Sequence, residues 1–114
     1  MSGPDAQSVG SVKVVAKGLI KAVPSAGTRQ ALSSSVLWAR GVVLAAPAAN
    51  AGVVYFGDVT VSNSAGFVIA PGATVSLKDL TGWGDLTVDL SRQYIDVATS
   101  GDKLSVLYFV MVTH

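Results

Sequence analysis

The sequence predicts an all-β protein, a β-sandwich or jelly-roll-like fold of about eight or nine short antiparallel strands. Residues 50–77 string together short apolar runs with turn-forming residues between them, a pattern typical of closely spaced antiparallel strands. Valine is abundant, whereas glutamate, a common residue of helix surfaces, is absent from the chain. We find no sustained amphipathic helix pattern, no internal repeat and no second domain in the sequence.

The first strand candidate, residues 11–23, places Lys13, Lys17 and Lys21 on one side and Val12 and Val14 on the other. A helix would also gather the three lysines on one face, because they are spaced by four residues. We favour a strand, since the glycine and the valines in this segment disfavour a helix.

Later strand candidates follow at a spacing of roughly 8–12 residues, as a sandwich or small barrel requires. Residues 28–35 allow either the start of a strand or one turn of helix. We expect a buried strand at residues 36–46, with a bulge at Gly41. Further strands are predicted at residues 53–56, 59–62, 67–70, 74–77, 86–90, 93–98 and 103–113. The connections are turns or loops, of which residues 78–85 form the longest and residues 99–102, TSGD, a hairpin turn.

The length of 114 residues suits one domain with a small core. We expect a flexible arm at residues 1–10 and a single β-sandwich domain at residues 11–114. Only 13% of the residues are charged, against about 25% in a typical soluble domain. Uncharged polar residues or neighbouring subunits must account for this difference, and we favour subunits, because a charge-poor monomer is prone to associate.

The charge and the residue types exclude several classes of function. A net charge of +1 predicts no strong attraction to nucleic acid or to a membrane surface. The chain has no cysteine, which excludes disulfides and thiolate metal sites. The polar N-terminus lacks the apolar core of a signal peptide, and no run approaches the ~20 apolar residues of a transmembrane helix.

Few residues could carry catalysis. The lone histidine is the terminal His114, a poor place for a general base, and without a histidine partner the serines cannot form a triad. Asp79, Asp85, Asp89 and Asp96 could supply a glycosidase acid pair or a Ca²⁺ site. Turn capping is the simpler interpretation and the one we favour. We therefore expect no enzyme, no metal and no cofactor.

The lysines and tryptophans are the other residues of note. Lys13, Lys17 and Lys21 could form a basic stripe for nucleic acid, but no stacking aromatics are interleaved with them, so a solvated strand face is favoured. Trp38 sits among apolar neighbours and is expected in the core. Trp83 lies between two glycines and could plug the core beneath a loop, anchor an interface or serve as a carbohydrate platform.

Two parts of the chain resemble a family of small tailed-bacteriophage virion structural proteins. The first reads NAGVVYFGDVTVS at residues 50–62 and continues through GF at 66–67 and PG at 71–72 to VSL at 75–77. The second reads YIDV at residues 94–97, followed by GDKLSVLY at 101–108. The resemblance covers roughly residues 30–110 and rests on turn-and-strand motifs, so it carries over no catalytic residue.

The resemblance implies a β-sandwich or jelly-roll protein of the virion, attached to a capsid or a tail. Among these roles we favour a capsid decoration (cement) protein, because of the small size, the low charge and the lack of tail-tube or adhesin features. Such a protein would bind the major capsid protein on the capsid exterior as a dimer or trimer, after synthesis in the host cytoplasm. The candidate interface residues are Trp83, Tyr55, Phe56, Lys13, Lys17 and Lys21.

Two further expectations follow. The arm at residues 1–10 would reach a neighbouring subunit and become ordered on binding. The alternative function is a tail- or fibre-associated head module that binds a receptor or a glycan, with Trp83 and Tyr55 as its contact residues.

Overall fold

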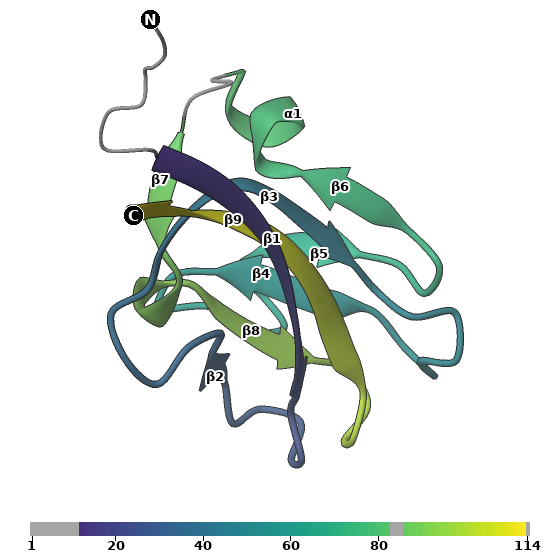
Figure 1. Ribbon diagram of the computed structural model, residues 1–114. Helices are drawn as coiled ribbons and strands as arrows, with labels where there is room; N and C mark the ends of the chain where they lie inside the picture. Colours follow the sequence, from purple (N-terminus) through teal and green to yellow (C-terminus); the bar gives the residue numbers. More distant parts are fainter. Residues whose placement is uncertain (1–11, 83–85, 114) are drawn as a thin grey trace, which may run out of the picture.

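The computed structural model describes residues 12–82 and 86–113, which form two stacked antiparallel sheets (Figure 1). Sheet A has the strand order β1-β9-β3-β6, and β7 also pairs with β3. Sheet B has the order β2-β8-β4-β5. The predicted all-β, sandwich-like fold is therefore confirmed. The predicted arm at residues 1–10 lies outside the described residues.

The long strands are concentrated in sheet A. Its strands are β1 (Val12–Ala22), β3 (Trp38–Ala45), β6 (Thr74–Ser76), β7 (Thr87–Asp89) and β9 (Lys103–Thr113). The strands of sheet B are β2 (Gln30–Ala31), β4 (Val54–Gly57), β5 (Phe67–Ile69) and β8 (Tyr94–Val97). Two short helical turns complete the described part of the chain, α1 (Leu77–Thr81) and the 3-10 turn η1 (Leu90–Arg92).

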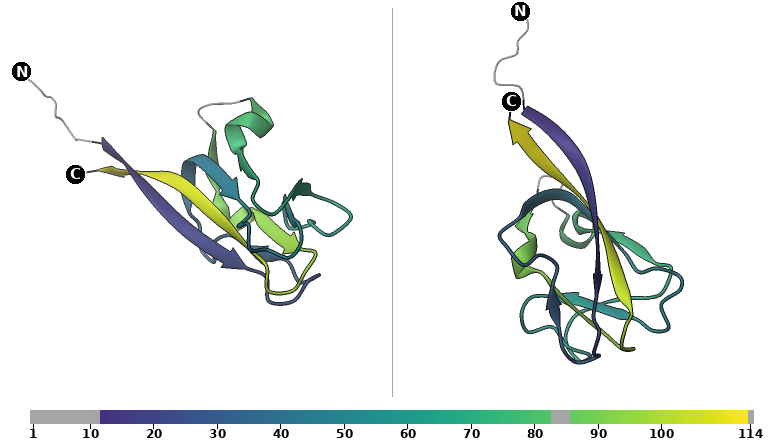
Figure 2. Two further views of the ribbon diagram at one scale, coloured as in Figure 1. Left: turned by 90° about the vertical axis from the view of Figure 1, so that its right-hand side faces the viewer. Right: turned by 60° about the horizontal axis from the view of Figure 1, so that its bottom comes forward.

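Strands β1 and β9 form a long antiparallel ribbon. Their register runs without interruption from Val12 opposite Thr113 to Ala22 opposite Lys103. Both views of Figure 2 show the start of β1 and the end of β9 projecting beyond the other strands. The predicted strand at residues 11–23 is confirmed, and β1 forms the outermost strand of sheet A.

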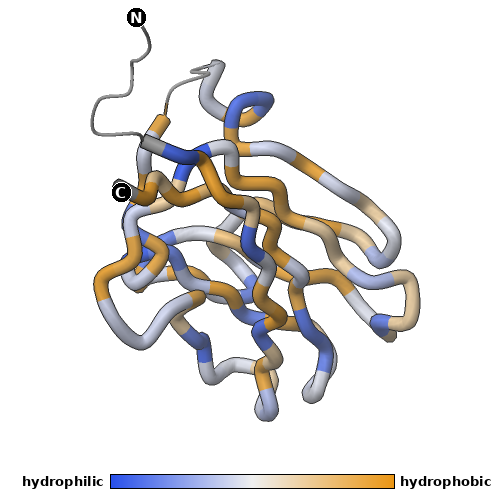
Figure 3. The backbone as a smooth tube through the Cα atoms, in the orientation of Figure 1, coloured by the Kyte–Doolittle hydropathy of each residue, from blue (hydrophilic) through white to orange (hydrophobic). Residues whose placement is uncertain are grey.

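The core lies between the two sheets and follows the alternation of side chains along the strands. Leu44 and Leu104 of sheet A and Ile95 of sheet B have no exposed surface. Burying each such side chain contributes about 1.5–3 kcal/mol. Figure 3 shows hydrophobic residues following the strands and hydrophilic ones gathered in several connecting loops.

Buried polar side chains fix the loops at one end of the sandwich. The Asp102 carboxylate accepts hydrogen bonds from the backbone N–H groups of Ala51 and Gly52, at 3.0 and 2.8 Å. The Asn50 side chain bonds both the carbonyl and the N–H of Lys103. These bonds tie the loop before β4 to the start of β9, and thus one sheet to the other.

Two of the predicted local structures are wrong because side chains cap turns there. The predicted strand at residues 59–62 is a turn, in which the Asp58 carboxylate accepts hydrogen bonds from the N–H and the hydroxyl of Thr60. The predicted loop at residues 78–85 begins instead with α1. The Ser76 hydroxyl caps this helix by accepting from the Asp79 N–H, and Gly82 ends it in the left-handed conformation.

The prediction that residues 99–102 form a hairpin is also wrong. These residues do form a turn, with the Asp102 N–H bonded to the Thr99 carbonyl and Gly101 at a φ of 90°. However, β8 pairs with β2 and β4, whereas β9 pairs with β1 and β3. The turn therefore carries the chain from sheet B to sheet A instead of joining two neighbouring strands.

Candidate functional site

An exposed apolar surface covers the side of sheet A that points away from sheet B. Because side chains alternate along β9, Leu104, Val106 and Tyr108 face the core while Leu107 and Met111 face outward. We call the outward surface the outer face of sheet A; it is formed mainly by Val14, Ile20, Val43, Leu107, Phe109 and Met111.

Several of these side chains are far more exposed than apolar residues in a core. Ile20 and Val14 are 66% and 63% exposed, and Met111 and Leu107 are 53% and 44% exposed. The four residues lie on the paired strands β1 and β9, so their side chains form a continuous strip. Contiguous apolar surface of this kind marks sites of interaction with other molecules.

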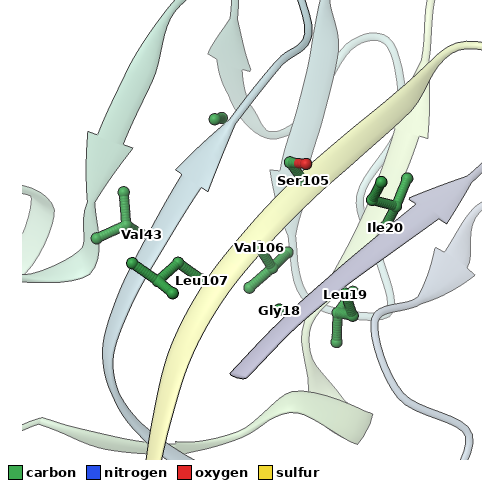
Figure 4. Close-up of a pocket in the computed structure, with 8 residues that line it drawn as sticks. Gly18, Leu19, Ile20, Val43, Ser105, Val106 and Leu107 are labelled. Carbon is green, nitrogen blue, oxygen red and sulfur yellow. The ribbon is translucent and has the colours of Figure 1, made fainter. Parts of the chain in front are cut away.

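A shallow groove of about 630 Å³ runs across this face (Figure 4). Its walls are Ile20 of β1, Val43 of β3 and Leu107 of β9, and small residues at Gly18 and Ser105 leave the space between them open. A Cβ at Gly18 would meet only the Val106 carbonyl oxygen, at 3.8 Å. Since neither the backbone nor a close contact demands glycine there, a larger residue would fill the groove.

A bulge in β3 determines which side chains reach the outer face at its far end. The pairing of β3 with β9 shifts between Arg40 and Val43, and Gly41 has a φ of 57°. A Cβ at Gly41 would lie 3.0 Å from the Phe109 ring, so this bulge position favours glycine. The predicted bulge at Gly41 is confirmed.

Trp38 does not lie in the core, contrary to the prediction from its apolar neighbours. Its side chain is 60% exposed, whereas the next residue, Ala39, is completely buried. Only one of two successive side chains in a strand can face the core, and here the small Ala39 occupies that position. The outer face of sheet A therefore gains a large aromatic side chain close to β7.

The three predicted interface lysines lie together on β1, on the face opposite to Val14 and Ile20. They sit across from Val112, Tyr108 and Leu104 of β9. Lys13 and Lys17 are exposed and Lys21 is half-buried. They thus belong to the core-facing side of sheet A, at its outermost strand, and not to its outer face.

The predicted aromatic interface residues lie apart from this surface. Phe56 is only 9% exposed and packs in the core, so its ring does not form part of the surface. Tyr55 is half-buried on the outward side of sheet B, where it lies between Val68 and Asp96. Trp83 lies outside the described residues.

The aspartates act as caps and loop anchors. Asp96 is 2% exposed and accepts hydrogen bonds from the N–H groups of Gly27 and Val97. Asp89 accepts from the Leu37 N–H and from the N–H and hydroxyl of Ser91, and these bonds hold the pKa of its carboxyl below the ordinary value of 3.8.

No metal or acid–base site emerges from these residues. Among the residues that the structure describes, no group of three or more metal-ligating side chains exists. Asp85 and His114 lie outside the described residues. A second, more polar hollow of about 510 Å³ lies beside Asp58, Arg92 and Tyr94. The Thr60 hydroxyl and N–H donate hydrogen bonds to the Asp58 carboxylate there, and these bonds lower the pKa of Asp58.

The sequence contains one signal for the outer face of sheet A. Residues 103–113 are apolar at both alternating sets of positions, with Leu104 and Val106 in one set and Leu107 and Met111 in the other. A strand with this pattern either is covered on both faces or presents an apolar surface. Only the tertiary structure shows which, because it places these residues in an outer layer.

Comparison with known proteins finds no matching family model, no matching curated protein and no matching solved structure. The two helical turns in the described part of the chain have neither the length nor the apolar character needed to traverse a membrane.

Proposed function

We propose that this protein is a bacteriophage virion structural protein, a capsid decoration protein that binds the major capsid protein through the outer face of sheet A. The observation that carries the proposal is the exposed apolar strip from Val14 and Ile20 to Leu107 and Met111, where the Arg40 guanidinium contacts the Met111 sulfur at one end. The resemblance of residues 50–77 and 94–108 to phage virion proteins supports the choice of partner. The charge-poor composition supports a role in assembly.

The size of the face indicates how it would work. An eleven-residue strand is about 36 Å long, and three strands side by side give a surface on the order of 500 Å². A stable binary complex buries about 800 Å² on each partner. A single face therefore binds weakly, and two or three copies joined as an oligomer would bind a shell of repeated sites far more tightly.

The groove on the outer face of sheet A is where a side chain of the capsid protein would insert. A side chain from the capsid subunit would fill the space between Ile20, Val43 and Leu107, where a well-packed anchor contributes most of the binding energy. No bond is made or broken in this mechanism. The protein stabilises the shell by burying apolar surface at junctions between capsid subunits, at about 25 cal/mol per Å² before the entropy of association is subtracted.

Sedimentation with expanded capsids that lack this protein tests the proposal. Leu107→Glu places a charge on the outer face, and Gly18→Val fills the groove without straining the backbone. We expect both variants to lower capsid affinity by at least about tenfold. Val68→Glu is the matched control, because Val68 is also about half exposed, at 52% against 44% for Leu107, but lies in sheet B.

The comparison between the variants decides the outcome. Wild-type occupancy of the capsid by the Leu107→Glu and Gly18→Val variants would reject the outer face as the contact surface. Absence of capsid binding by the wild-type protein would reject the decoration function itself.

A further inference from the structure

The free edge of β1 is a second surface, distinct from the outer face of sheet A. β1 pairs along its whole length of eleven residues with β9, and no other described strand pairs with it. The other outermost strands of the described sheets, β2, β5, β6 and β7, have only two or three residues each. A short edge strand has few backbone groups to pair with an added strand, whereas β1 has eleven residues along which one could pair.

The edge of β1 that points away from β9 carries backbone groups that can pair with another strand. In an antiparallel strand about half of the N–H and C=O groups point away from the existing neighbour. The start of β1 and the end of β9 project beyond the other strands (Figure 2), and β9 is the only described strand that pairs with β1. An extended segment from another molecule could therefore continue sheet A by one strand.

The side chains of β1 define what such a segment must look like. Lys13, Lys17 and Lys21 lie on one face, at every fourth residue, with Val15 and Leu19 between them. Within the described part of the chain these lysines form no ion pair. An added strand would therefore meet three unpaired positive charges on one face and, on the other, apolar or small residues such as Val14 and Ile20.

A second copy of this chain is a poor occupant of the edge. Two β1 strands related by a two-fold axis, with like faces on the same side, would place Lys17 opposite Lys17 and Lys13 opposite Lys21 in the centred register. Directly opposed like charges destabilise a strand pair, and a slip of two residues leaves the lysines diagonal to one another. The lysines thus act against self-association through this edge.

We infer that the β1 edge binds an extended segment of a partner protein as an added β-strand, with acidic side chains at every fourth position opposite Lys13, Lys17 and Lys21. Main-chain hydrogen bonds would supply the affinity, and the three charge pairs the choice of partner. The positions between the acids would be apolar or β-branched, to match Val15 and Leu19 on one face and Val14 and Ile20 on the other. This inference does not depend on the proposed function.

Peptide binding to the full-length protein tests the inference. The probe is a fluorescent peptide that spans β1 from Lys13 to Lys21, with glutamate opposite each lysine and valine or threonine between. One control peptide has the same composition but consecutive glutamates, which cannot all face the lysines. A second control carries lysine in place of glutamate, and a third has N-methyl groups on the amides that would bond the edge.

We expect the patterned acidic peptide to bind about tenfold more tightly than each control, because the first two controls lose the cross-strand charge pairs and the third loses main-chain hydrogen bonds. Its binding should also weaken as salt is added. In the variant Lys13→Glu, Lys17→Glu, Lys21→Glu the preference should reverse, so that the lysine peptide binds best. Because the peptide comparison uses the wild-type protein, it stands even where this variant does not fold.

Three results would overturn the inference. The first is equal binding of the patterned and consecutive acidic peptides, and the second is binding that N-methylation does not weaken. The third is a short single-stranded DNA that competes as strongly as the patterned peptide, which would show that the lysines attract any polyanion.

Discussion

The outward faces of the two sheets differ in what covers them. On sheet B, the loop after β1 comes close enough for the Gly27 N–H to bond the Asp96 carboxylate, which is almost completely buried. On sheet A, no described segment covers Ile20 or Leu107, and the strip remains exposed. Polar bonds with fixed partners thus cover part of sheet B from within the chain, although Val68 on its edge strand β5 is 52% exposed. The longer apolar strip on sheet A is available to another molecule.

This difference separates the residues that stabilise the fold from the residues that are available for binding. Apolar residues between the sheets and the buried aspartates near the loops hold the fold together. The outer face of sheet A and the edge of β1 add little to the fold and are therefore the places where substitutions can change binding without unfolding the protein.

The largest expected effect on the free energy of unfolding comes from comparing a core residue, Ile95, with a residue of the outer face of sheet A, Leu107. Ile95→Ala should lower the free energy of unfolding by about 2–5 kcal/mol, because Ile95 is completely buried and its truncation leaves a cavity. Leu107→Ala should cost under about 1 kcal/mol, because Leu107 is 44% exposed. Chemical denaturation of both variants measures the contrast, and similar losses would show that the outer face is part of the core.

A smaller effect tests the anchored surface of sheet B. Asp96→Ala removes the acceptor for the Gly27 N–H and should lower the free energy of unfolding by about 1–3 kcal/mol. Hydrogen exchange at the Gly27 amide should become faster, since the loop loses its anchor. Asp79→Ala, at an exposed position, is the control and should change stability by no more than about 0.5 kcal/mol. Unchanged exchange at Gly27 would contradict the anchoring role.

The smallest effect concerns a polar anchor at the margin of sheet A. The Leu37 N–H and Ser91 lower the pKa of Asp89 in the folded protein, so the unfolded chain binds a proton more readily. The stability contributed by Asp89 is therefore present above its ordinary pKa of 3.8 and is lost as the pH falls through the lower, folded value. Denaturation across acidic pH should show a shallower loss for Asp89→Asn than for the wild type.

A second variant completes this test. Ser91→Ala removes one of the bonds that favour the charged carboxylate and should give an intermediate pH dependence. Identical acid profiles for all three proteins would mean that Asp89 does not couple protonation to folding.

The local patterns predicted the strands but not their partners. Alternation over residues 11–23 and the apolar run at residues 103–113 predicted two strands, and β1 and β9 confirm them. The turn at residues 99–102 was predicted equally well, but its role as a hairpin was not, because β8 and β9 pair with strands distant in the sequence. Pairing depends on contacts between remote residues, which a local pattern does not contain.

The candidate surfaces show the same division. The lysines of β1 and their shared face could be read from their spacing, whereas the exposure of Trp38, Ile20 and Leu107 could not. Trp38 and Phe56 both have apolar neighbours in the sequence, yet one is 60% exposed and the other 9%. Their burial depends on which face of the sandwich each strand turns inward.

By itself the sequence determined that this chain forms short antiparallel strands, because alternation, valine content and turn residues act over a few neighbouring positions. The tertiary structure alone decided that β1 ends sheet A with β9 beside it, that the outer face of these two strands remains exposed, and that Asp96 and Asp102 anchor loops distant in the sequence. The physical reason is that the burial of a side chain depends on how the two sheets stack. A side chain is covered only when another part of the chain packs against it, and that depends on the topology of the whole fold.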